Sequence, residues 1–298
     1  MKEWKVIFSP DSQERGKELA INLEFLWGGR RWKLPSLYLF EEGVMLDFLL
    51  EGSIEELDAF IGKWDLLHEQ EHDYSELERE QMEQEHPLWM DFTPTLCLNG
   101  QSVKYKGCTG RCWIPAACLD GNTMEDRSMQ AVMEHYSLDE RKGWGFRRCR
   151  FLFTEEKQRD LQRMELSLSQ APRTVLGEIL RSPQAGTILD FRHPVSGQIQ
   201  RLTVHGISTE VLNNGGGMEG YLQQLSYSVE PDTALTLRDT QPSDCGFAPI
   251  LLLPKAKGQK IALSSLRKEP VTATDWQLLF TVKTVEDIRI NQTRTKED

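Results

Sequence analysis

The sequence contains no long apolar run and few cysteines, and each absence excludes a class of protein. Among its 298 residues, no apolar stretch approaches the roughly 18 residues that a membrane helix requires. Six cysteines are too few for a disulfide scaffold, so we expect all six to be thiols in a reducing compartment. The first residues, Met1 to Lys5, do not begin an apolar stretch of the kind found in a secretory signal. The sequence therefore predicts a cytoplasmic protein that binds no membrane.

An excess of basic residues is also missing. The chain has 35 Lys and Arg against 46 Asp and Glu, which gives a net charge of −11. This charge repels phosphate backbones, so we expect no nucleic-acid partner. Residues 65–86 contain nine of the acids and a single base, Arg79, so this one segment holds most of the negative charge.

Common catalytic signatures are largely absent. The chain has no G-x-S-x-G elbow, no P-loop and no kinase signature. Residues Gly215 to Gly220 match G-x-G-x-x-G, but the following stretch, Tyr221 to Val229, alternates like a strand. A dinucleotide site needs a helix at that point, because the helix N-terminus holds the pyrophosphate. We interpret the glycines as a loop between strands and expect no cofactor.

The patterns that are present indicate an α+β fold that is mainly antiparallel β. Strand-like alternation fills residues 4–50, 93–119 and 144–153, and it dominates from residue 186 onward. Asn99-Gly100 suits a tight hairpin turn. Helices are expected within residues 53–86, where Ser53 and Glu56 form a capping box, and near residues 123–137.

A weak internal similarity suggests two β-rich units. Gly43 to Phe48 resembles Gly186 to Phe191, and Trp4 to Phe8 resembles Trp276 to Phe280. Two units, residues 1–140 with an acidic helical insertion at about 53–86 and residues 141–298, would explain the spacing. The alternative is coincidence between hydrophobic strands.

One motif resembles a metal site. His68-Glu69-Gln70-Glu71-His72 matches H-E-x-x-H, in which two histidines one helical turn apart bind zinc and the glutamate takes a proton from zinc-bound water. On a helix, however, these histidines would face away from the apolar residues at 67, 74 and 77. We interpret the segment as a solvated acidic surface. The alternative is a zinc-dependent hydrolase with His68 and His72 as ligands and Glu69 as the base.

Four cysteines fall within 22 residues, which raises the question of a structural metal. Their spacing does not form the two close pairs that are typical of zinc knuckles. We interpret them as buried thiols, and a metal bound by Cys108, Cys112 and Cys118 is the alternative. The four are Cys97, Cys108, Cys112 and Cys118.

Two basic stretches suggest contacts with partners. Residues 27–33 interleave tryptophan with basic side chains, which is typical either of base stacking or of a hairpin tip with solvated arginines, and we favour the hairpin. Residues 255–268 contain five bases and no acid, so they could dock the acidic segment of the same or another chain. The sequence thus favours a non-catalytic binding or assembly protein, with a protein partner or a second copy of itself. The five bases are Lys255, Lys257, Lys260, Arg267 and Lys268.

Overall fold

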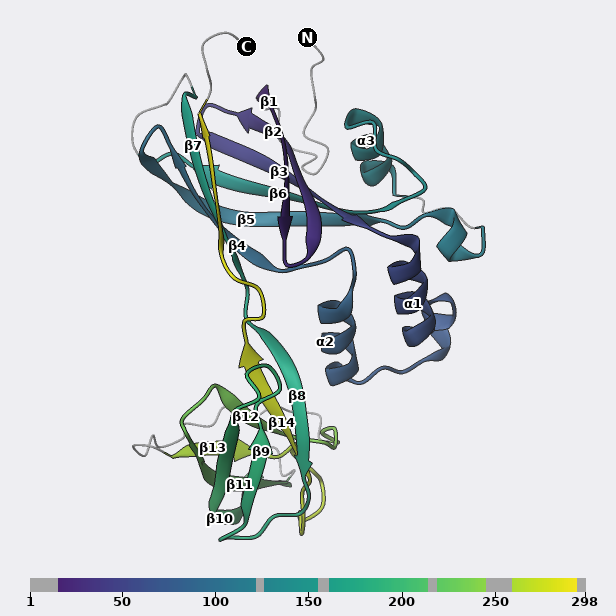
Figure 1. Cartoon of the computed structure of the whole chain (residues 1–298). Coiled ribbons are helices and arrows are strands. Elements are labelled where there is room, and N and C mark those ends of the chain that lie inside the picture. The colour runs from purple at the N-terminus through teal and green to yellow at the C-terminus, as the bar shows by residue number, and fades with distance from the viewer. Residues whose placement is uncertain (1–15, 122–125, 155–160, 214–218, 245–258, 294–298) are drawn as a thin grey trace. The chain divides into compact units, whose positions relative to one another are not determined.

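The computed structural model describes residues 16–121, 126–154, 161–213, 219–244 and 259–293 (Figure 1). Strands predominate, and all pairings between the described strands are antiparallel. The expectation of an α+β protein that is mainly antiparallel β is therefore confirmed. The chain divides into two compact units, Met1–Ala171 with Val285–Asp298, and Pro172–Thr284.

Along the chain, the boundaries between the two compact units fall between residues 171 and 172 and between residues 284 and 285. Strand β6 (Gly143–Leu152) pairs with β3 (Gly43–Gly52) and with β5 (Gln101–Trp113). Strand pairing thus joins the segment after residue 140 to the first unit. The same holds for β7 (Arg163–Gln170), which pairs with β4 (Phe92–Leu98), and for β15 (Ile288–Thr293), which pairs with β7.

The first unit is built on an eight-stranded sheet in the order β1-β2-β3-β6-β5-β4-β7-β15. The sheet is strongly curved, and its two edge strands approach each other: the side chain of Gln292 on β15 donates to the carbonyl oxygen of Ile21 on β1 at 3.3 Å. Apolar side chains fill the inner face and exclude water from it. The largest of them are Trp27, Trp32, Phe48, Phe92 and Phe151.

The first hairpin joins β1 (Lys17–Trp27) to β2 (Arg30–Leu39). Gly28 and Gly29 form the turn with φ values of 61° and 73°, a conformation that favours glycine. The predicted hairpin tip is therefore confirmed. Both tryptophans beside the turn are buried in the core, so they present no face on which a base could stack.

Three α-helices lie within the described part of the first unit. The capping box predicted at Ser53 begins α1 (Ile54–Trp64), and a second box at Ser75 begins α2 (Glu76–Glu85). A 3-10 segment, Leu66–Glu71, lies between them. Helix α3 (Arg127–His135) packs Met129, Val132 and Met133 against side chains on the outer face of β3 and β6.

The second unit consists of two small sheets that share one core. One has the order β13-β11-β10-β9 and the other β12-β14-β8. In the first of these sheets, the β9–β10 ladder pairs residues 188–192 with residues 199–203. The strands are β8 (Arg173–Leu180), β9 (Ile188–Arg192), β10 (Ile199–Asn213), β11 (Glu219–Glu230), β12 (Leu235–Asp239), β13 (Lys260–Leu263) and β14 (Trp276–Val282).

Residues 4–8 and 250–253, which belong to stretches where the sequence predicts strands, lie outside the described residues. Where the structure describes the chain, none of its helices is both long enough and apolar enough to cross a membrane.

Candidate binding site

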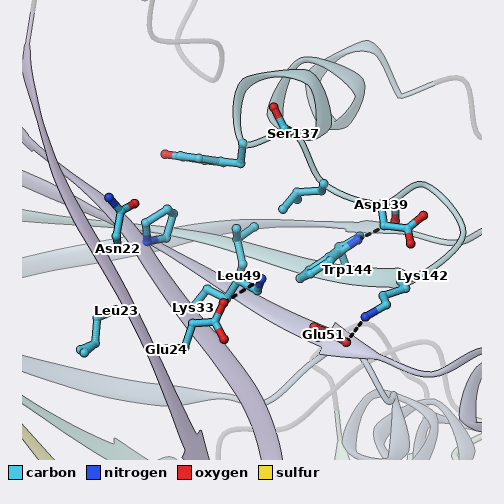
Figure 2. Close-up of a pocket in the computed structure, with 13 residues that line it drawn as sticks. Asn22, Leu23, Glu24, Lys33, Leu49, Glu51, Ser137, Asp139, Lys142 and Trp144 are labelled. Carbon is cyan, nitrogen blue, oxygen red and sulfur yellow. Dashed lines mark hydrogen bonds and ion pairs between the residues drawn. The ribbon is translucent and has the colours of Figure 1, made fainter.

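A pocket of about 410 Å³ opens on the outer face of β1, β2 and β3, beside the turn that follows α3 (Figure 2). The sheet supplies its floor, and the turn supplies a wall formed by residues 136–139. Charged side chains and apolar side chains both line it. Its lining consists of Asn22, Leu23, Glu24, Lys33, Pro35, Leu49, Glu51, Tyr136, Ser137, Leu138, Asp139, Lys142 and Trp144.

One charged pair crosses the β1–β2 hairpin at the floor of this pocket. Glu24 and Lys33 are directly opposite in the ladder, and the Lys33 Nζ lies 3.0 Å from the Glu24 Oε1. The hydrogen bond from Lys33, together with its charge, holds the pKa of Glu24 below the ordinary value. The same ammonium group lies 5.5 Å from the centre of the Trp144 ring, which adds a cation–π contact. Lys33 therefore contacts both a carboxylate and an aromatic ring.

A second charged pair lies on the other side of Trp144. The Nζ of Lys142 donates to the Oε1 of Glu51 at 2.5 Å, and Figure 2 shows both side chains beside the tryptophan. The indole N–H of Trp144 donates to the backbone oxygen of Asp139 at 2.9 Å. This bond ties the turn after α3 to the sheet. The pocket therefore has a Lys–Glu pair on each side of one aromatic ring.

A buried ion pair lies beneath α3, next to the pocket. Asp47 on β3 accepts two hydrogen bonds from the guanidinium of Arg148 on β6, at 2.7 and 2.6 Å. Both side chains are buried, with relative exposures of 0% for Asp47 and 7% for Arg148. The Tyr136 hydroxyl, one residue past α3, donates to the Asp47 Oδ2 at 2.6 Å. Tyr136 also lines the pocket, so the buried pair sets the position of the pocket wall.

The polar network continues from Tyr136 to β1. The hydroxyl of Tyr38 lies 2.8 Å from that of Tyr136 and 3.1 Å from the Oε1 of Glu18. The same Glu18 oxygen accepts from the Ser36 hydroxyl at 2.5 Å and contacts the Nε2 of His135 at 3.0 Å. The chain of contacts therefore links β1, β2 and β3 to the end of α3.

The pKa shifts in this network favour the protonation states in which its groups form the observed hydrogen bonds. Burial and the charge of Asp47 raise the pKa values of Tyr38 and Tyr136, so both hydroxyls remain protonated at neutral pH. Burial opposes the charge of Arg148, but the hydrogen bonds and the charge of Asp47 raise its pKa above the ordinary value. Burial likewise opposes ionisation of Glu18, yet the bonds from Ser36 and His135 lower its pKa. The charged groups of the network therefore remain ionised and hydrogen-bonded. A network of this kind rigidifies the wall of the pocket.

The H-E-x-x-H motif does not lie on an α-helix. It falls mostly in the 3-10 segment, and His68 itself has non-helical backbone angles. The two histidines nevertheless converge, because the Nδ1 of His68 and the Nε2 of His72 each lie 2.9 Å from a different oxygen of Asp65. The side chain of Glu69 lies outside the described residues. Within the described ranges, no group of three or more His, Cys, Asp or Glu is arranged to hold a metal ion.

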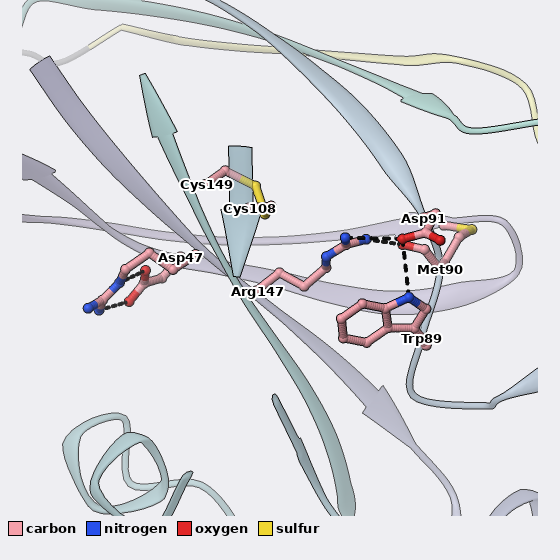
Figure 3. Close-up of a disulfide and its surroundings, with 8 residues drawn as sticks. Asp47, Trp89, Met90, Asp91, Cys108, Arg147 and Cys149 are labelled. Atoms are coloured by element: carbon pink, nitrogen blue, oxygen red, sulfur yellow. Dashed lines mark hydrogen bonds and ion pairs between the residues drawn. A yellow bond between two sulfur atoms is a disulfide. The ribbon is translucent and has the colours of Figure 1, made fainter. Parts of the chain in front are cut away.

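The cysteines differ from the expectation of six thiols. Cys108 on β5 and Cys149 on β6 are directly opposite in the ladder and form a disulfide (Figure 3). The sequence could not show this pairing, because the two residues are 41 positions apart and meet only when the strands align. Cys97, Cys112 and Cys118 remain free. Burial raises the pKa of Cys112 to about 12, which disfavours the thiolate that a metal would need.

Arg147 precedes Arg148 on β6. Its side chain lies on the inner face of the sheet, because successive residues of a strand face opposite sides. Its Nη1 donates to the backbone oxygen of Met90 at 2.6 Å, and its Nη2 donates to Asp91 at 3.1 Å (Figure 3). The guanidinium also lies 4.5 Å from the ring centre of Trp89. These contacts attach the segment before β4 to β6, so the role of Arg147 is structural.

The basic run near the C-terminus is partly neutralised within its own unit. Lys260 lies 2.9 Å from Asp232, and Arg267 lies 2.7 Å from the buried carboxylate of Asp239. Lys255 and Lys257 lie outside the described residues, as do the glycines at 215–217. Docking of residues 255–268 on the acidic segment, residues 65–86, therefore stays a hypothesis.

The polar network and the pocket were not identified from the sequence. One signal was available: Asp47 interrupts an otherwise apolar strand between Val44 and Leu50, and a charge in such a run needs a buried partner. Arg148 lies in another strand with apolar neighbours. The pairing itself depends on the β3–β6 register, which only the fold defines.

Comparison with known proteins yields no significant match, whether with protein-family models, with curated proteins or with solved structures.

Proposed function

We propose that the protein is a non-catalytic binding protein, and that the pocket between β1–β3 and the turn after α3 is its binding site. The observation that supports this proposal is the combination of a pocket of about 410 Å³ with two Lys–Glu pairs around one aromatic ring. Side chains that are already paired in this way lose less conformational entropy when a ligand binds.

The pocket offers hydrogen-bonding groups of both kinds to a ligand. An ammonium group has three donors, so Lys33 and Lys142 keep donors available beyond those that their carboxylate partners use. The carboxylates of Glu24 and Glu51 keep acceptor positions in the same way. A polar ligand could therefore bind to the existing pairs without breaking them.

Ligand-observed NMR on a mixture of amino acids, short peptides, sugars and nucleotides tests the proposal. Glu24→Trp places an indole in the pocket and is expected to abolish the saturation-transfer signal of the bound compound. Glu178→Trp, at an exposed position of β8, is the matched control and should leave the signal unchanged. A signal that survives Glu24→Trp, or a mixture in which nothing binds, would contradict the assignment.

The zinc-dependent hydrolase remains the competing proposal, since His68 and His72 do converge on Asp65. It would use these histidines as ligands and Glu69 as the base. Metal analysis of the purified protein separates the two proposals: stoichiometric zinc that disappears in His68→Ala supports the hydrolase, and a protein without metal supports the binding protein.

The remaining expectations are part of the same proposal: a cytoplasmic location, no nucleic-acid or membrane partner, and a protein partner or second copy. The disulfide bears on the location, because disulfides are rare in reducing compartments. Rapid thiol trapping in the native host tests it, and oxidised Cys108 would argue against the cytoplasm.

Self-association through the acidic segment should weaken with salt, and sedimentation of a monomer at low salt would contradict it.

A further inference from the structure

Strand β5 has a strand partner on both sides only at its start. Residues 101–103 pair with residues 96–98 of β4, and the two strands then diverge (Figure 1). From Lys104 to Trp113 the strand pairs with β6 alone. Within the described ranges, the backbone of residues 104–110 forms no hydrogen bond to backbone groups outside the β6 ladder. This stretch is therefore an open edge of the sheet, and an open edge can pair with an added strand.

The spacing of the β5–β6 ladder shows which backbone groups face the open side. The Cα atoms of Cys108 and Cys149 lie 4.2 Å apart. This distance is close to the roughly 4.5 Å of an opposite pair that exchanges no backbone hydrogen bonds, whereas a bonded pair is separated by about 5.5 Å. The N–H and C=O groups of Cys108 are therefore directed away from β6, and those of Gly110 follow by alternation. Both residues are partly accessible to solvent.

The side chains along this edge are basic. Residues 104–113 contain three bases, Lys104, Lys106 and Arg111, and no acid, and all three bases are exposed. Arg111 lies 3.4 Å from Asp126. Neither lysine forms a hydrogen bond or ion pair with the part of the chain that the structure describes. The open stretch therefore has two cations that the described residues do not neutralise.

This charge decides between the strands that could be added to the edge. A second copy of the chain would place one basic β5 edge against another, and like charges directly opposite destabilise a pair of strands. Lysines on an edge strand discourage self-pairing for the same reason. An extended segment with acidic side chains would instead meet each lysine with a carboxylate, and its backbone would offer partners to the open groups of β5.

We propose that the open edge of β5, residues 104–110, binds an extended acidic segment of a partner protein by strand addition. Backbone hydrogen bonds to Cys108 and Gly110 hold the segment, and Lys104 and Lys106 select its charge. At about 3.4 Å per residue this stretch spans about 24 Å, which a peptide of about eight residues covers. Strand β5 contributes no residue to the lining of the pocket, so this inference is independent of the proposed pocket ligand.

Fluorescence anisotropy with dye-labelled eight-residue peptides tests the inference on the full chain. A peptide of alternating threonine and glutamate is expected to bind, and its threonine–lysine counterpart is not. N-methylation of the backbone amides removes the donors of the glutamate peptide but keeps its charge, so binding should weaken at least about tenfold. Equal affinity for the methylated peptide or for inorganic polyphosphate would overturn strand addition, as would a glutamate peptide that does not bind.

A charge-reversed variant tests the selection. Lys104→Glu/Lys106→Glu should lower the preference for the glutamate peptide over the lysine peptide about tenfold or more, because it reverses two charges on the edge. A gain of affinity for the lysine peptide separates this effect from misfolding. Lys17→Glu/Arg289→Glu, at exposed positions of β1 and β15, is the matched control and should keep the original preference. An unchanged preference in the β5 variant would overturn the role of the lysines.

Amide hydrogen exchange locates the bound peptide. Exchange should slow in residues 104–113 when the glutamate peptide binds, because the open N–H groups of β5 become hydrogen-bonded. Protection confined to other strands would overturn the assignment. A dimer in sedimentation that protects residues 104–113 without any peptide would assign the edge to a second copy and would also overturn it.

Discussion

Asp47 and Arg148 lie directly opposite each other on β3 and β6 and form a two-point ion pair that α3 covers. A second pair in the molecule has the same cross-strand register: Asp190 and Arg201 on β9 and β10, bonded at 2.7 and 2.9 Å. The second pair is exposed, with about half of each side chain accessible to solvent. The two pairs therefore differ mainly in burial.

Asp47→Ala should lower the free energy of unfolding by about 3–5 kcal/mol, because it leaves the charge of Arg148 buried without a partner. The double variant Asp47→Leu/Arg148→Leu should cost less than the single one, since it removes both charges. Urea denaturation measures both. Asp190→Ala, the control on the exposed pair, should change stability little. Equal losses for Asp47→Ala and Asp190→Ala would show that burial of the first pair does not matter.

Tyr136→Phe should destabilise the protein by about 1.5–3 kcal/mol, because its hydroxyl donates to a buried carboxylate. The same change should weaken ligand binding at the pocket, whose wall begins at this residue. Amide hydrogen exchange in α3 should rise in the variant. Tyr221→Phe is the control: its hydroxyl donates to Glu219 at the surface, so its loss should have little effect. Unchanged exchange in α3 would contradict the anchoring role of Tyr136.

Removing the disulfide with Cys108→Ala/Cys149→Ala should lower stability by about 2–4 kcal/mol, because the bond closes a loop across 41 positions in the unfolded chain. Mass spectrometry after alkylation of the denatured protein without reductant should find only the other cysteines labelled. Cys97→Ala, the control on a half-buried free thiol, should change stability less. Labelling of Cys149 before reduction would contradict the assignment.

His86 should make stability fall on mild acidification. Its ring packs against Phe60 and accepts a hydrogen bond from the backbone N–H of Leu88, and burial together with the nearby charge of Arg30 lowers its pKa from 6.5 to about 4. Between these two values the unfolded chain binds a proton that the folded chain does not. Stability therefore rises with pH across this window and is lost as pH falls from about 6.5 toward 4.

From pH 7 to pH 5 this contribution amounts to about 2 kcal/mol. His86→Gln keeps an acceptor for Leu88 but cannot titrate, so it should flatten the urea-derived stability profile by that amount. A profile that His86→Gln does not alter would refute the assignment.

Much of the local structure could be predicted from the sequence, because it depends on neighbours along the chain. The capping box of Ser53 and Glu56, the hairpin at Asn99-Gly100 and the glycine turn after Trp27 each involve residues within a few positions of one another. Alternation of apolar and polar residues identified most of the described strands. The binding site could not be predicted in this way, since Lys33, Glu51, Tyr136 and Lys142 come from four separate segments.

By itself, the sequence determined that the protein is mainly antiparallel β, that a helix begins at the serine cap of residue 53, and that the acidic residues concentrate in one segment. The tertiary structure alone decided that Cys108 meets Cys149, that Asp47 meets Arg148, and that residues 143–170 belong to the first unit. The reason is physical: strand propensity and caps are set within a few residues, whereas register is set by packing a whole sheet around one core. A shift of one residue in the β3–β6 register would place Asp47 opposite a different residue. The bonds from Arg148 to Asp47, which help to position the wall of the pocket, would then be lost.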